Sequence, residues 1–245
     1  MSDTRRRFLQ HLSLGGIALG GAPALLGASS PTEAPRARGA SEGTLLPPDV
    51  AGALHDEQPA QPTFDTTWAQ KLTGKYKAVF DVPELNEGSG VFRAGLWRTH
   101  YTQLLQATPA DLSPVIVIRH NAMPFIMTHE FWDRYDVAAK EKLKHPMNGQ
   151  ETRRNIVNMD ASDGMSPVFA GYAIEKQIEA GTIVLGCNMA FSAMVALVRE
   201  VDKLQGGAAR EKAISMMIPG VQLQPNGIFA VTWAQHHGCS FVAAS

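Results

Sequence analysis

Residues 114–118 (PVIVI) are the segment that most narrows the folds open to this chain. Four of the five are β-branched, and such side chains fit an extended strand better than a helix. Both alternating sets of positions are apolar, so a strand here is expected to be buried on both of its faces. Strands of that kind belong to parallel sheets, whose crossover helices cover both faces.

The rest of the folded region alternates between strand and helix patterns. Further short apolar strands are predicted at 75–81, 182–186 and 240–243. Apolar spacing and stop signals predict helices at 91–106, 127–143, 169–180, 189–204 and 228–237. Hydrophobic residues make up 44% of the chain, enough for a sizeable core. We therefore expect an α/β fold of the three-layer α/β/α kind, with a mostly parallel sheet in the middle.

The N-terminal segment has the layout of an export signal. Residues 4–10 (TRRRFLQ) resemble the twin-arginine motif, and an uncharged, glycine-rich apolar run follows at 12–28. That run is too short and too rich in glycine for a membrane span, which needs about 20 strongly apolar residues. We expect residues 1–28 to be a twin-arginine (Tat) signal peptide recognised by the Tat translocase. The mature protein would then be periplasmic or otherwise exported, with no stable membrane span after processing.

The alternative interpretation of the three arginines is an arm that binds nucleic acid. The formal net charge of the chain is −1, and no basic block recurs after residue 7. Nucleic-acid-binding domains carry clustered positive charge, so we expect no nucleic-acid partner.

Composition divides the remainder into a linker and one domain. Residues 29–66 are rich in Pro, Ala, Gly, Ser and acids, which predicts a flexible linker. The folded domain is expected at 67–245, with an insertion near 131–168. The polar, turn-rich part of that insertion, 144–167, is interpreted either as a lid that attracts an anion or as a solvated surface loop.

Polar residues follow three of the predicted strands at one edge of the sheet. Asp81 ends the first strand, Arg119 and His120 follow the second, and Cys187 follows the third. Ligands of open parallel sheets bind outside the carboxyl ends of the strands. Cys187 also precedes a helix, whose N-terminus favours a thiolate. The competing interpretation is that Cys187 is a small buried hydrophobic residue.

The second cysteine and the other histidines are expected elsewhere. Cys239 precedes the last strand and belongs to the opposite edge, so we predict no disulfide with Cys187 within one chain. His236 and His237 are expected to interact with the carbonyls that end a helix. A metal held by His120, His129 and His145 is a further alternative, on nonspecific spacing.

Three segments resemble the DsrE/DsrF-like family, which is associated with sulfur relay. They are EKQIEAGTIVLGCNMAF around Cys187, IPGVQLQPNGIFAVTWAQHHGCSFV at the C-terminus, and the second strand PVIVIRHNAMPF, which sits where the family has a strand leading into the site. The resemblance covers roughly 75–245 and implies a compact α/β fold, frequent oligomers and, in some members, a cysteine that carries persulfide sulfur. Only Cys187 matches that position. The export signal and the insertion depart from the family pattern.

The favoured hypothesis is an exported protein that binds or carries sulfane sulfur on Cys187, without a metal or other cofactor. His120 or Arg119 would tune the thiolate or bind an anionic sulfur compound, and the pocket would be bordered by Asp81, Asn86 and Asn188. A homo-oligomer is expected. The alternatives are a noncatalytic periplasmic binding or assembly module and a protein that holds a metal or redox cofactor.

Overall fold

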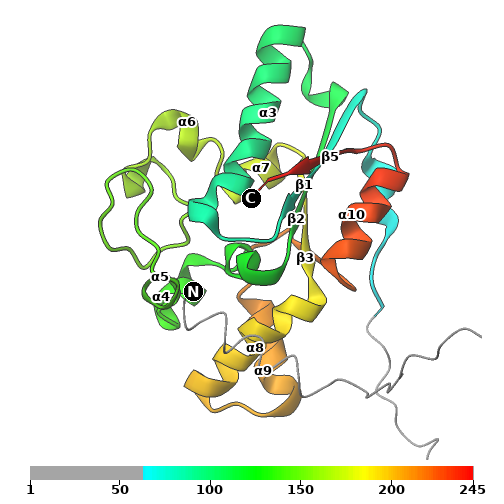
Figure 1. Cartoon of the computed structure of the whole chain (residues 1–245). Helices are drawn as coiled ribbons and strands as arrows, with labels where there is room; N and C mark the ends of the chain where they lie inside the picture. The colour runs from blue at the N-terminus through cyan, green and yellow to red at the C-terminus, as the bar shows by residue number, and fades with distance from the viewer. Residues whose placement is uncertain (1–62, 245) are drawn as a thin grey trace, which may run out of the picture. The chain divides into compact units, whose positions relative to one another are not determined.

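The computed structural model describes residues 63–244, which form a five-stranded, wholly parallel sheet. The spatial order of the strands is β4-β3-β2-β1-β5, and Figure 1 labels all of them except β4. The strands are β1 (Tyr76–Val82), β2 (Leu112–Ile118), β3 (Ile183–Cys187), β4 (Gln222–Gln224) and β5 (Ser240–Ala243). The predicted parallel sheet is confirmed. The expected signal peptide and nearly all of the expected linker lie outside the described residues.

The central strand β2 explains why the sheet is covered on both sides. All seven of its residues are buried. Val115 and Val117 point into one apolar core, whereas Ile116 and Ile118 point into the other. This alternation is the period-2 geometry of a strand. The PVIVI run is therefore buried in the way its composition predicts.

Helices cover both faces, which confirms the three-layer α/β/α expectation. One face carries α3 (Ser89–Leu105), the 3-10 helix η4 (His120–Ile126) and α8 (Asn188–Asp202), all packed in the larger core. The other face carries α10 (Gly227–His236) and the 3-10 helix η1 (Thr67–Lys71). In Figure 1, α10 and α3 lie on opposite sides of the strands. The remaining elements are η2 (Asn86–Gly88), η3 (Pro109–Asp111), α4 (His129–Arg134), α5 (Val137–Glu141), η5 (Ala161–Asp163), α6 (Pro167–Ala170), α7 (Ile174–Glu179) and α9 (Gly206–Ser215).

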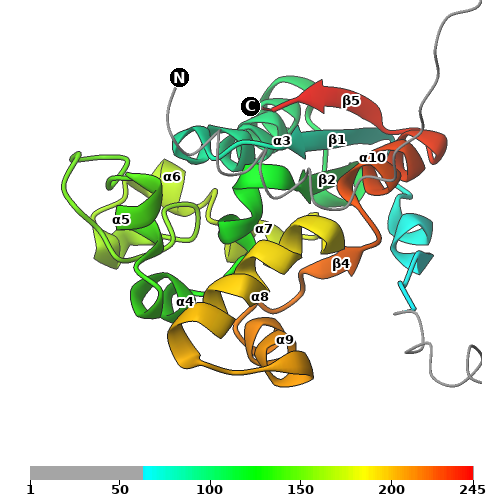
Figure 2. The same cartoon turned by 60° about the horizontal axis from the view of Figure 1, so that its bottom comes forward.

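The connections after β3 and β4 leave toward opposite faces of the sheet. From β3 the chain enters α8, on the side of the larger core, whereas from β4 it enters α10 on the other side. Figure 2 shows α8 and α10 diverging from neighbouring strands. Helix α10 then crosses the sheet, and β5 pairs with β1. A divergence of this kind opens the carboxyl edge of a parallel sheet to ligands.

Several predicted helices are shorter than expected or divided. The helix predicted at 127–143 is two helices, α4 and α5, because Asp136 adopts a left-handed conformation with φ of 52°. The helix predicted at 169–180 is likewise divided into α6 and α7. Helix α9 begins at Gly206, where a helix end was expected, and the three-residue strand β4 was not predicted.

The polar segment 144–167 is not wholly a solvated loop, because its middle is built into the core. Residues 155–159 are all buried. The Asn155 side chain, which is 0% exposed, donates from Nδ2 to the carbonyl oxygens of Phe125 (2.9 Å) and Met127 (2.7 Å). Its Oδ1 accepts the Val157 N–H at 3.2 Å. One polar side chain thus joins this segment to η4.

Within residues 63–244, no helix combines the length and apolar character needed to cross a bilayer.

Candidate functional site

The carboxyl edge of the sheet carries a paired arginine and aspartate. Arg119 follows β2 directly, and Asp81 is the penultimate residue of the neighbouring β1. Arg119 donates from Nε to Asp81 Oδ1 at 2.7 Å and from Nη2 to Oδ2 at 2.8 Å. This hydrogen-bonded pairing raises the pKa of Arg119 above its ordinary value. The expected convergence of these two residues is confirmed, and Asp81 holds the guanidinium in a fixed orientation.

Cys187 lies at the same edge, at the N-cap of the 15-residue helix α8. Its Sγ accepts a hydrogen bond from the Ala190 N–H at 3.4 Å. The residue is 6% exposed. An N–H donor and a helix N-terminus both interact more favourably with a thiolate than with a neutral thiol. The predicted placement of Cys187 at a strand end before a helix is therefore correct.

Arg119 lies close to the ends of neighbouring strands. The Asp81 hydrogen bond is the main cause of its raised pKa, and Cys187 is among the smaller Coulombic contributions, which places Cys187 in the surroundings of the guanidinium. On its other side, the Arg119 stem crosses the start of α10. A Cβ built on Gly227 would lie 2.5 Å from Arg119 Cδ and 2.7 Å from its Cβ. The absence of a side chain at Gly227 gives Arg119 its position.

A second arginine approaches the site from a helix that sequence reasoning missed. Arg210 of α9 donates from Nη2 to Asn188 Oδ1 at 2.6 Å, and its guanidinium lies 5.5 Å from the centre of the Phe191 ring. Asn188, the first residue of α8, was predicted to bind a ligand. Its side-chain oxygen is instead occupied by Arg210. Because α9 was not predicted, no sequence signal pointed to this arginine.

His120 sits on the same edge but is bound to an acidic residue. It opens η4 with φ of 53°, and its Nδ1 lies 3.3 Å from Glu84 Oε1. The other oxygen of Glu84 accepts from Asn121 Nδ2 at 2.8 Å. The structure thus places His120 among the strand-end residues, as predicted, with Glu84 as an unforeseen neighbour.

Asn86 lines a different hollow from the rest of the predicted site. Residues 86–88, which immediately precede α3, all have positive φ and form a strained stretch of backbone. The hollow there has a volume of about 350 Å³ and is lined largely by apolar side chains, Phe92, Met147, Met165 and Phe169 among them. None of its lining residues is Asp81, Arg119 or Cys187. The expectation of one pocket bordered by Asp81 and Asn86 together is not met.

The second cysteine is remote from this edge. Cys239 precedes β5, at the amino edge of the sheet, and both cysteines are free, as predicted. Burial raises the pKa of the Cys239 thiol to about 11. His237 Nδ1 contacts the carbonyl oxygen of Trp233 at 2.9 Å, which agrees with the predicted role at a helix end.

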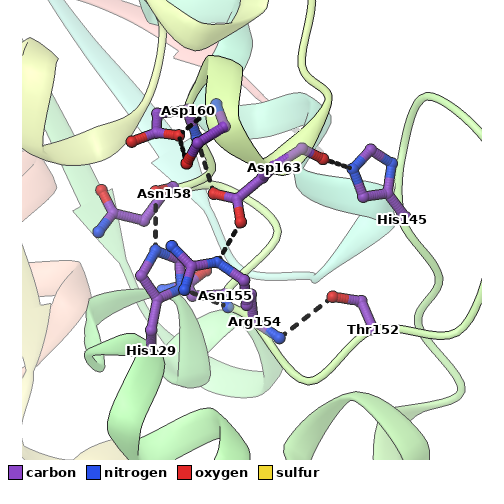
Figure 3. A network of polar contacts seen from close by, with 9 residues as sticks. His129, His145, Thr152, Arg154, Asn155, Asn158, Asp160 and Asp163 are labelled. Atoms are coloured by element: carbon purple, nitrogen blue, oxygen red, sulfur yellow. Dashed lines mark hydrogen bonds and ion pairs between the residues drawn. The ribbon is translucent and has the colours of Figure 1, made fainter.

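His129 and His145 form hydrogen bonds with the backbone (Figure 3). His129 accepts the Asn155 N–H at Nδ1 (3.0 Å) and contacts the Asn158 carbonyl oxygen through Nε2 (3.0 Å). Burial is the main cause of its lowered pKa, which favours the neutral ring. His145 contacts the Asp163 carbonyl oxygen at 2.6 Å. Within residues 63–244, no three His, Cys, Asp or Glu side chains are grouped closely enough to hold a metal.

The fold and the edge together define a class: an open, parallel α/β protein with a cysteine at the N-cap of the helix that follows β3. Comparison with known proteins adds no relative, since no family model, no curated protein and no solved structure matches this chain.

Proposed function

We propose that this protein carries sulfane sulfur on Cys187. The observation that carries the proposal is the hydrogen bond from the Ala190 N–H to Sγ at the start of α8. This donor and the helix N-terminus stabilise negative charge on sulfur, as a thiolate and as a persulfide. Arg119, held in position by Asp81, lies at the same edge of the sheet.

The proposed step is a thiol exchange that balances without an oxidant. The Cys187 thiolate attacks the outer sulfur of a persulfide, polysulfide or thiosulfate. A bond forms between Sγ and that sulfur, the donor's own sulfur–sulfur bond breaks, and the donor leaves as a thiolate, as a polysulfide shorter by one sulfur, or as sulfite. Arg119 would attract the anionic donor, while Arg210 would orient Asn188 beside it. His120 lies at the same edge, where it is held by Glu84.

The DsrE/DsrF-like resemblance supports the same proposal. The segments that carry it are β2, the strand and helix around Cys187, and the elements from β4 to β5. We propose an exported member of that kind, sent to the periplasm by the twin-arginine route and assembled as a homo-oligomer. A periplasmic carrier would exchange sulfur with small sulfur compounds of that compartment.

The test is the intact mass of the protein after incubation with polysulfide. We expect a gain of one or more sulfur masses that disappears in Cys187→Ser. Cys239→Ser is the matched control, because it removes the other buried cysteine and should load like the wild type. Loading that survives in Cys187→Ser would refute the proposed mechanism.

One observation favours a second candidate, a noncatalytic binding or assembly module. Cys187 is only 6% exposed, which is also the burial of an ordinary core cysteine. In that case the folded protein would take up no sulfur, and iodoacetamide would modify Cys187 no faster than Cys239. Rapid modification of Cys187 alone would argue against this candidate.

A further inference from the structure

A hollow between α3 and α7 shares no lining residue with the Cys187 site. Its volume is about 320 Å³, the size of a small-molecule pocket. One wall is a single face of α3, and the other is the start and body of α7 with the turn before it. A Cβ on Gly95 would overlap the Tyr172 ring, and the Tyr172 hydroxyl is hydrogen-bonded to Thr99 Oγ1 at 2.9 Å. These contacts hold the two walls in place.

A buried amide lines this hollow with an unused acceptor. Gln177 is 2% exposed, and its Nε2 donates to the carbonyl oxygens of Val91 (3.0 Å) and Tyr172 (2.7 Å). Because both partners are acceptors, the orientation of the amide is fixed. Its Oε1 is buried and finds no hydrogen-bond partner in the described part of the chain. Leaving such an oxygen unpaired is costly, so a donor on a bound molecule would stabilise it.

The same hollow has a net positive lining. Arg98 donates to the Ala180 carbonyl oxygen and to Thr182 Oγ1, and it forms no ion pair with any carboxylate in 63–244. Lys176 lies at the rim, where it pairs with the exposed Glu179. None of the lining residues is acidic. Arg98 retains further N–H donors for an anion, since a guanidinium carries five.

We propose that this hollow binds a small hydroxycarboxylate. The carboxylate would face Arg98 and Lys176, and the hydroxyl would donate to Gln177 Oε1. A neutral donor suits the position better than an ammonium group, which would be repelled by the two nearby cations. The ligand class follows from one unpaired acceptor and one uncompensated guanidinium on facing walls.

The test compares three probes that each have three carbons, by calorimetric titration of the purified protein. Lactate offers both groups, propanoate lacks the hydroxyl, and propane-1,2-diol lacks the charge. We expect lactate to bind saturably and each of the other two to bind about tenfold more weakly. Cys187→Ser should bind lactate like the wild type, because the two sites are separate.

Variants localise the binding. Arg98→Gln should weaken lactate binding by about tenfold, and Lys176→Gln by about threefold. Lys140→Gln makes the same charge change on α5, outside the hollow, and should have no effect. Circular dichroism establishes that each variant is folded. Propanoate binding as tight as that of lactate would overturn the proposal. So would unchanged lactate affinity in Lys176→Gln, which decides the matter if Arg98→Gln does not fold.

Discussion

At the scale of single residues, the two cysteines show how position in the fold changes the surroundings of the same kind of side chain. Cys187 meets an amide N–H at the start of a helix, whereas Cys239 is buried among apolar residues before β5. The sequence predicted this difference, because each cysteine lies at a recognisable end of a strand. It did not predict that Arg210 would engage Asn188, since that contact joins two helices whose packing has no local signature.

The titration of Cys239 should lower stability at high pH. Burial raises its pKa from the ordinary 9.0 to about 11, so the folded protein keeps a proton that the unfolded chain releases in this interval. Its contribution to stability is complete below pH 9 and is lost as the pH rises toward 11. Between pH 8 and 10.5, urea denaturation should show a loss about 2 kcal/mol larger for the wild type than for Cys239→Ala. Parallel pH profiles would contradict the assignment.

Gly227 gives the sharpest steric prediction. A methyl group there would lie 2.5 Å from Arg119 Cδ, so Gly227→Ala must displace the arginine stem. We expect a loss of about 1–3 kcal/mol in the free energy of unfolding, with weaker sulfur loading. Gly207→Ala is the control, because the nearest atom to a Cβ there is a flexible side-chain oxygen at 4.0 Å. Equal effects of the two substitutions would show that the close packing at Gly227 does not position Arg119.

At the scale of helices and strands, burial determined which elements could be predicted from the sequence. The PVIVI strand was predictable because all its neighbours in the sheet and both helical layers select apolar residues. Strand β4 was not, because its three residues QLQ carry too little pattern. The start of α9 was missed since its first residues, Gly206 and Gly207, resemble a helix end.

The segment that contains Asn155 should prove structural. Asn155→Ala would leave the carbonyl oxygens of Phe125 and Met127 without a side-chain donor and the Val157 N–H without an acceptor. We expect a loss of about 3 kcal/mol in stability, measured by denaturant titration. Asn148→Ala, an exposed position in the same segment, should cost less than about 1 kcal/mol. Comparable losses at both positions would show that the buried contacts contribute little.

At the scale of the whole molecule, the sequence predicted the layers and the parallel sheet but not the full order of the strands. The order depends on where α10 crosses the sheet, and a helix of ten residues carries no information about its direction. The candidate site was predicted in part. The strand-end rule placed Asp81, Arg119, His120 and Cys187 at one edge, whereas Asn86 lines a separate hollow.

The proposed export route makes a prediction about the complete chain. Replacing Arg5 and Arg6 together by lysine should block delivery to the periplasm, because the twin-arginine route reads the arginine pair itself. Cell fractionation with immunodetection measures the outcome. The matched control replaces Arg36 and Arg38 by lysine and should leave export intact. Detection of the Arg5, Arg6 variant in the periplasm would rule out export by the twin-arginine route.

The pairing of β5 with β1 has a consequence for the order of events during synthesis. Ala78 of β1 lies in register with Ser240 of β5, about 160 positions later in the chain. One edge of β1 therefore stays open until residue 243 has emerged from the ribosome. Native contacts between such distant segments form late, since a long loop must close first. A nascent chain stalled before α10 would expose an unpaired apolar strand, which invites chaperone binding or aggregation.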